Sequence, residues 1–118
     1  MSEQNREEAV KLFKALVDTH PEIELKGKDM LYTSANGHMF TILNKQDSEV
    51  GIRLPKEARQ AFIAEHNTQL HESYGATMKE YVRVPFDLLK ETQKLAPYLV
   101  QSYDYVKGLE PKPTKEKK

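Results

Sequence analysis

Cysteine is absent from this sequence, which excludes disulfide bonds, thiolate zinc sites and a cysteine nucleophile. Net charge is also absent, because 18 basic residues balance 18 acidic ones, so no overall field attracts nucleic acid or an anionic membrane. No apolar run approaches the roughly 18 residues that a membrane span needs, and the polar N-terminus has no signal-peptide pattern. We therefore expect a cytoplasmic protein with no membrane partner, and we do not expect nucleic acid as a direct partner.

Sequence motifs for catalysis are incomplete throughout the chain. Gly27 and Lys28 lack the upstream glycine and the following Ser or Thr of a phosphate-binding loop. No Gly-x-Ser-x-Gly nucleophile elbow occurs. His66 and His71 lie five residues apart across a predicted helix end, with no carboxylate pattern to complete a metal site. The sequence therefore predicts no catalytic residue, no metal and no cofactor, and it favours a protein that is not an enzyme.

Hydrophobic periodicity divides the chain into helices and strands. Apolar residues at helical spacing predict a first helix over residues 5–19, which His20 and Pro21 end. Asn36 and Gly37 lie between two strand-like runs and predict a type I′ hairpin turn, because both residues tolerate positive φ. The other predicted strands cover residues 23–26, 30–34, 38–44, 49–54, 69–73 and 78–84, and the other predicted helices cover residues 55–66 and 87–107, with a short first turn at 87–90.

This order of elements predicts an α+β domain in two layers. A mostly antiparallel sheet of five or six strands, in the order α-β3/4-α-β2-α, would carry its helices on one face. Residues 1–108 would form this single domain. Residues 109–118 contain two prolines and four lysines, with almost nothing apolar, which predicts a disordered tail.

Strand alternation predicts which side chains the helices leave uncovered, because successive residues of a strand point to opposite faces. Phe40 and Ile42 in residues 38–44, and the valines in residues 78–84, would face the helices. The residues between them would lie on an open face of the sheet. This open face would carry Thr41 and six candidate interaction residues, Met39, Leu43, Arg53, Lys79, Tyr81 and Arg83.

The predicted open face combines methionine, tyrosine and arginine, which are residue types that interface centres favour. We interpret it as a surface for a protein partner or for a homodimer. An ordinary solvated sheet face has the same pattern and is the simpler alternative. Weak nucleic-acid binding is another alternative, although only Tyr81 clearly offers a ring for base stacking. A last alternative is a small-ligand-binding protein or an enzyme with a pocket between sheet and helices.

Four runs of residues stand in a distinctive order along the chain. Residues 36–40 read Asn-Gly-His-Met-Phe, residues 52–55 read Ile-Arg-Leu-Pro, and residues 95–99 read Leu-Ala-Pro-Tyr-Leu. Residues 75–89 have the pattern Gly-x-x-Met-x-x-Tyr-x-x-x-Pro-x-x-Leu-Leu. In this order the runs resemble the N-terminal domain of the TfoX (Sxy) family of bacterial competence regulators.

The resemblance to the TfoX N-terminal domain implies an α+β sheet domain, here of the stand-alone, single-domain type, with no established catalytic motif. It implies a regulatory role linked to transcription and competence, through a partner of the CRP type. The sequence departs from the family at residues 28–31, which read Lys-Asp-Met-Leu and lack the glycines of the family's Met-Phe-Gly-Gly run. We therefore do not carry over any function that depends on that loop.

Overall fold

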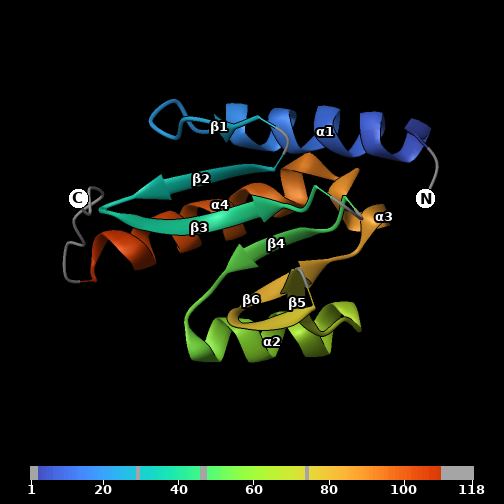
Figure 1. The fold of residues 1–118 in the computed structure, drawn as a ribbon. Helices are drawn as coiled ribbons and strands as arrows, with labels where there is room; N and C mark the ends of the chain where they lie inside the picture. Colours follow the sequence, from blue (N-terminus) through green and yellow to red (C-terminus); the bar gives the residue numbers. More distant parts are fainter. Residues whose placement is uncertain (1–2, 29, 46–47, 74, 110–118) are drawn as a thin grey trace.

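The computed structural model describes residues 3–28, 30–45, 48–73 and 75–109 (Figure 1). Within these residues six antiparallel strands form one sheet in the order β1-β2-β3-β4-β6-β5, which confirms the predicted α+β class. The elements are α1 (Glu3–Asp18), β1 (Lys26–Gly27), β2 (Leu31–Ala35), β3 (His38–Leu43), β4 (Val50–Arg53), α2 (Lys56–His66), β5 (Leu70–Ser73), β6 (Ala76–Val84), α3 (Phe86–Leu89) and α4 (Thr92–Lys107).

Local sequence signals account for most of these boundaries. The apolar stripe of α1 is buried as predicted, at Ala9, Phe13, Leu16 and Val17. The β2–β3 turn has positive φ at both central residues, 58° at Asn36 and 80° at Gly37, as a type I′ turn requires. The strand predicted over residues 23–26 is shorter than expected, because pairing with β2 is limited to Lys26 and Gly27.

The helices and the sheet enclose one hydrophobic core. Helix α4 crosses β2, β3 and β4 behind the sheet in Figure 1, and α1 and α3 pack against α4. Helix α2 runs along β6, and the ring of Phe62 on α2 lies 4.9 Å from the ring of Tyr98 on α4. The predicted tail included Leu109, but Leu109 packs against the core. The rest of that predicted tail, residues 110–118, lies outside the described residues.

An irregularity in the β2–β3 pairing changes which side chains face the helices. Thr33 pairs with Thr41, and Ser34 pairs with Met39, so Phe40 is an extra residue in β3. Such a β-bulge interrupts the alternation of side chains along a strand. Phe40 therefore points into the core, as predicted, and the residues that follow it in β3 reverse the predicted alternation.

The expected orientations of Thr41, Ile42 and Leu43 are therefore wrong. Leu43 is fully buried in the core, where it pairs with Leu31 on one side and Val50 on the other. Thr41 is also fully buried, and its hydroxyl lies 2.6 Å from the Thr33 hydroxyl. Ile42 instead pairs with Gly51 on the side of the sheet away from the helices. The bulge thus removes Leu43 from the candidate interaction surface.

Candidate functional site

The open face of the sheet carries two cross-strand pairs that β4 and β6 form. Arg53 pairs with Tyr81, and Gly51 pairs with Arg83, so the backbone directs Arg53, Tyr81 and Arg83 toward the face opposite the core. The end of the Arg53 side chain nevertheless reaches the Met39 carbonyl of β3 and the Tyr105 ring of α4. The valines of β6, Val82 and Val84, are buried in the core as predicted. This agreement follows from the regular pairing of β4 with β6, because neither strand has a bulge in that ladder.

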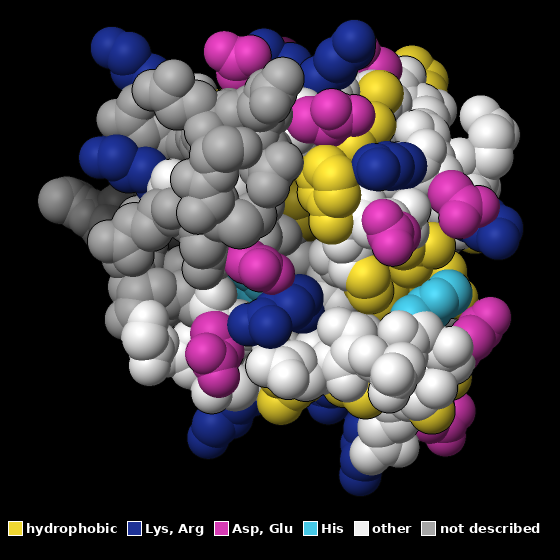
Figure 2. Space-filling view, turned by 90° about the vertical axis from the view of Figure 1, so that its right-hand side faces the viewer, with side chains coloured by type: hydrophobic (Ala, Val, Ile, Leu, Met, Phe, Trp, Pro, Cys, Tyr) yellow, Lys and Arg dark blue, Asp and Glu magenta, His cyan; other side chains and the backbone are white. Residues whose placement is uncertain are grey.

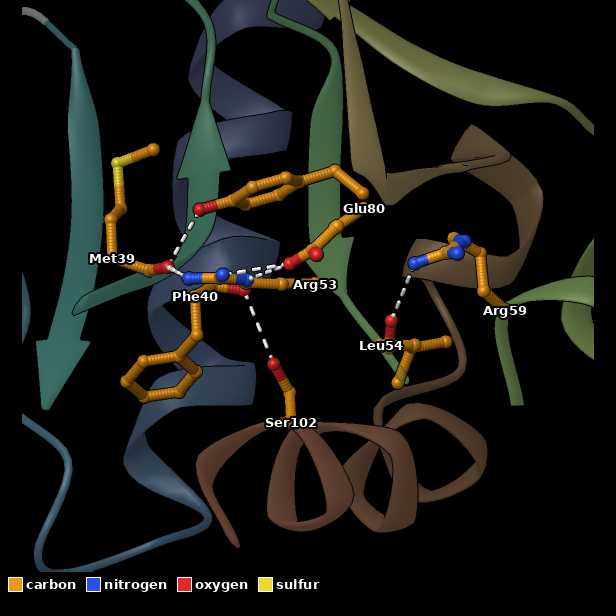
Figure 3. Close-up of polar contacts among 8 residues, drawn as sticks. Met39, Phe40, Arg53, Leu54, Arg59, Glu80 and Ser102 are labelled. Atoms are coloured by element: carbon orange, nitrogen blue, oxygen red, sulfur yellow. Dashed lines mark hydrogen bonds and ion pairs between the residues drawn. The ribbon is translucent and has the colours of Figure 1, made fainter. Parts of the chain in front are cut away.

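Tyr81 and Arg53 hydrogen-bond to a backbone carbonyl at the bulge in β3. The Tyr81 hydroxyl donates to the Met39 carbonyl at 2.6 Å, and Arg53 Nη1 donates to the same oxygen at 3.4 Å. The Ser102 hydroxyl of α4 donates to the next carbonyl, that of Phe40, at 3.3 Å (Figure 3). The pairing of β3 with β4 ends at Thr41, so the Met39 and Phe40 carbonyls lie beyond it. The side chains of Tyr81, Arg53 and Ser102 donate the hydrogen bonds that these two carbonyls need.

Arg53 is held in place by more than the Met39 carbonyl. Its Nε and Nη2 atoms both lie 2.7 Å from Glu80 Oε1 (Figure 3). The guanidinium carbon also lies 5.7 Å from the ring centroid of Tyr105 on α4, within cation–π range. The Arg53 side chain is 18% exposed. It therefore presents a fixed, partly desolvated surface.

The remaining candidate residues of the open face differ in their exposure. Arg83 Nε lies 3.1 Å from Glu49 Oε1, and the two side chains are 30% and 32% exposed. Lys79 is exposed and Met39 is half-buried. Tyr81 is 7% exposed, so its ring offers little surface for base stacking. The structure thus leaves Met39, Arg53, Lys79 and Arg83 as the accessible part of the predicted surface.

A histidine that sequence reasoning assigned no role covers part of the open face. His71 of β5 is fully buried, and its Nε2 lies 3.1 Å from Asn44 Oδ1. Asn44 Nδ2 donates to the Glu72 carbonyl at 2.8 Å, so Oδ1 faces the imidazole and Nε2 carries the hydrogen. A Cβ at Gly51 would lie 2.6 Å from His71 Cγ. Gly51 within a strand was the available signal, because such a glycine marks close approach of another group.

The raised pKa of Tyr81 gives a test of the burial of its hydroxyl group. Burial raises this pKa from 10.0 to about 12, Glu80 also raises it, and Arg53 opposes the change. Because the folded-state pKa is the higher one, the stability that Tyr81 contributes is present below pH 10 and is lost as the pH rises through 12. We expect wild type to lose about 2–3 kcal/mol more than Tyr81→Phe over this range.

Urea denaturation of wild type and Tyr81→Phe at pH values from 8 to 12 measures this difference. Below pH 10 we expect Tyr81→Phe to be less stable by about 1–2 kcal/mol, because the Met39 carbonyl loses its short hydrogen bond. If the stabilities of the two proteins changed in parallel up to pH 12, this result would contradict a raised pKa for Tyr81.

A second aromatic cluster lies between α2 and α4. The Tyr98 hydroxyl is 3.5 Å from His66 Nε2, and the rings of Phe62 and His66 are 4.6 Å apart. Burial raises the pKa of Tyr98, and the charge and hydrogen bond of Glu65 raise it further. A tyrosine with a raised pKa stays protonated near neutral pH, so it offers a hydrogen-bond donor and not a base. We assign this cluster to packing between the two helices.

The surface near α3 carries scattered apolar side chains. Figure 2 shows the side of the molecule at the right of Figure 1, where small apolar groups alternate with charged side chains. The exposed large apolar side chains among the described residues are Phe86, at 38%, and Val100, at 39%. Lys90 Nζ lies 5.1 Å from the Phe86 ring centroid. Apolar residues distributed in this way are ordinary for a protein surface.

The described residues contain no group of three or more His, Asp or Glu side chains arranged to hold a metal ion. None of the helices in the described ranges is long and apolar enough to cross a membrane. Comparisons with known protein families, with curated proteins and with solved structures found no match to this chain.

Proposed function

We propose that this chain is a non-enzymatic regulatory domain of the TfoX N-terminal type, which acts through protein contacts in the cytoplasm. The order of the four sequence runs supports the proposal, because each run falls on a distinct part of the fold: the β2–β3 hairpin, the end of β4, the β6–α3 segment and α4. The proposed contact surface is Met39, Arg53, Lys79 and Arg83. The link to transcription and competence regulation belongs to the same proposal.

The observation that carries the proposal is the fixed position of Arg53. Its guanidinium is held by the Glu80 carboxylate and the Met39 carbonyl, and it lies near the Tyr105 ring. A side chain that is already ordered loses little conformational entropy on binding, so it contributes more to affinity. Arginine, methionine and tyrosine are also enriched in protein interfaces.

Charge favours a protein partner over nucleic acid at this surface. Both arginines lie beside carboxylates, Arg53 beside Glu80 and Arg83 beside Glu49. Binding to nucleic acid depends on cations that replace counterions along the phosphate backbone, and a carboxylate beside each guanidinium opposes this. A protein partner can bind the same pairs through hydrogen bonds and apolar contacts around them.

Substitution of Lys79 and Arg83 tests the surface without disturbing the Met39 carbonyl. We expect Lys79→Ala/Arg83→Ala to weaken association, with itself or with a captured partner, by about tenfold or more. Light scattering over a concentration series measures self-association, and capture from cell extract followed by a binding titration measures a partner. Lys94→Ala is the matched control, because Lys94 is 66% exposed on α4.

Three outcomes decide between the proposals. Loss of binding in the double variant but not in Lys94→Ala supports the open face as the contact surface. Equal binding by wild type and both variants contradicts it. Binding to DNA whose affinity falls steeply with salt would favour the nucleic-acid alternative instead.

A further inference from the structure

The side chain of Asn36 connects the β2–β3 turn to the end of α4. Its Nδ2 donates to the Leu109 carbonyl at 2.7 Å and to the Val106 carbonyl at 3.0 Å, and it lies 3.4 Å from the Lys107 carbonyl. Figure 1 shows the tip of this hairpin beside the C-terminal end of α4. These contacts join residues that are 70 to 73 positions apart in sequence.

The Asn36 amide completes the C-terminal cap of α4. The last carbonyls of a helix have no partner within the helix. Neither Gly108, the C-cap residue with φ of −86°, nor Leu109 after it has the left-handed conformation that commonly satisfies these carbonyls. The amide N–H groups of Asn36 donate from another element to the Val106 and Leu109 carbonyls, and the Leu109 N–H also donates to the Val106 carbonyl at 3.2 Å. A hydrogen-bond donor is favoured there and an anionic acceptor is disfavoured, because the helix end carries partial negative charge.

Asn36 is followed by Gly37, and this pair permits a covalent reaction. Gly37 has no side chain to hinder its backbone nitrogen from reaching Asn36 Cγ. In that reaction the Gly37 nitrogen loses its proton and bonds to Cγ, the Cγ–Nδ2 bond breaks, and ammonia leaves. Water then opens the succinimide ring at either carbonyl and yields aspartate or isoaspartate. Water is the only co-reactant.

We propose that Asn36 is a deamidation site that the folded hairpin protects and whose reaction releases the end of α4. The protection arises because Cγ can meet the Gly37 nitrogen only after the amide leaves the Val106 and Leu109 carbonyls. Release follows because an aspartate at position 36 has no side-chain N–H group and places negative charge against those oxygens. The reaction is irreversible, so each opening of the contact carries a risk of permanent loss of the cap.

Peptide mass spectrometry tests the protection directly. Wild-type protein is incubated at about pH 8.5 and 37 °C, folded or in denaturing urea, and then digested with trypsin. Cleavage after Lys28 and Lys45 gives a peptide with both Asn36 and Asn44, and Asn44 is the internal control because a lysine follows it. We expect Asn36 to react about tenfold or more slowly in the folded protein, as local opening would limit the rate.

Two variants separate local opening from general unfolding. Val106→Ala weakens the end of α4 without changing the Asn-Gly pair, and Ile63→Ala on α2 lowers stability elsewhere. Faster deamidation in Val106→Ala than in an equally destabilised Ile63→Ala supports local protection. Equal acceleration in both variants, or equal rates in folded and unfolded wild type, overturns it.

The effect of the reaction on α4 has its own measurement. Asn36→Asp reproduces one product and is expected to melt at a lower temperature than wild type at pH 7. An unchanged melting temperature would show that the cap does not depend on the amide and would overturn the proposed release. Absence of reaction at Asn36 even in urea would overturn the assignment of the site.

Discussion

Replacement of Gly51 by alanine is expected to lower the free energy of unfolding by about 2–3 kcal/mol, because overpacking a filled site forces side chains or backbone to move. The new Cβ would lie 2.6 Å from His71 Cγ and 2.8 Å from Cδ2. His71 cannot shift freely, since it is fully buried and its Nε2 is hydrogen-bonded to Asn44. The substitution therefore tests whether β5 covers this part of the open face.

Urea denaturation of Gly51→Ala and Gly108→Ala measures the effect with a matched control. The Gly108 Cβ would meet its nearest atoms at 3.6 and 3.7 Å, which is ordinary contact, and its φ is −86°. We expect Gly108→Ala to change stability by less than about 0.5 kcal/mol. Equal stabilities of the two variants would contradict the close approach of His71 to Gly51.

A double-mutant cycle strengthens the same test. His71→Ala removes the ring, so Gly51→Ala should cost at least about 1 kcal/mol less in that background than in wild type. Additive effects of the two substitutions would show that the residues do not contact each other.

Replacement of Leu43 by alanine is expected to destabilise the fold by about 3 kcal/mol, within the range of 2–5 kcal/mol for buried leucines. Leu43 is fully buried between Leu31 and Val50, and the bulge at Phe40 directs it into the core. Simple alternation would instead place Leu43 on the open face, where truncation costs little. This variant therefore distinguishes the bulged strand from a regular one.

Met39→Ala is the control for Leu43→Ala, because Met39 is half-buried in the same strand. The substitution keeps the hydrogen bonds from Tyr81 and Arg53, since the Met39 backbone carbonyl accepts them. We expect Met39→Ala to cost about 1 kcal/mol or less. Thermal and urea denaturation of both variants provide the measurement. A larger loss for Met39→Ala than for Leu43→Ala would favour the regular strand.

Local sequence patterns determined the elements of this fold and part of its sheet. Helical periodicity identified the buried stripe of α1, and Asn36 with Gly37 identified the β2–β3 turn. Alternation placed the valines of β6 correctly, because β6 pairs with β4 without a bulge. Each of these properties depends on residues within one helix, strand or turn, where spacing along the chain also sets direction in space.

Tertiary structure alone decided what the candidate residues contact. The bulge at Phe40 moved Leu43 into the core, and a regular alternation pattern gives no sign of an extra residue. The Tyr81 hydroxyl bonds to a carbonyl 42 residues away, and the Asn36 amide reaches residues 70 or more away. Hydrogen bonds of this kind depend on how elements pack against each other. For the same reason Tyr81, which strand alternation directs away from the core, is buried and hydrogen-bonded within the fold.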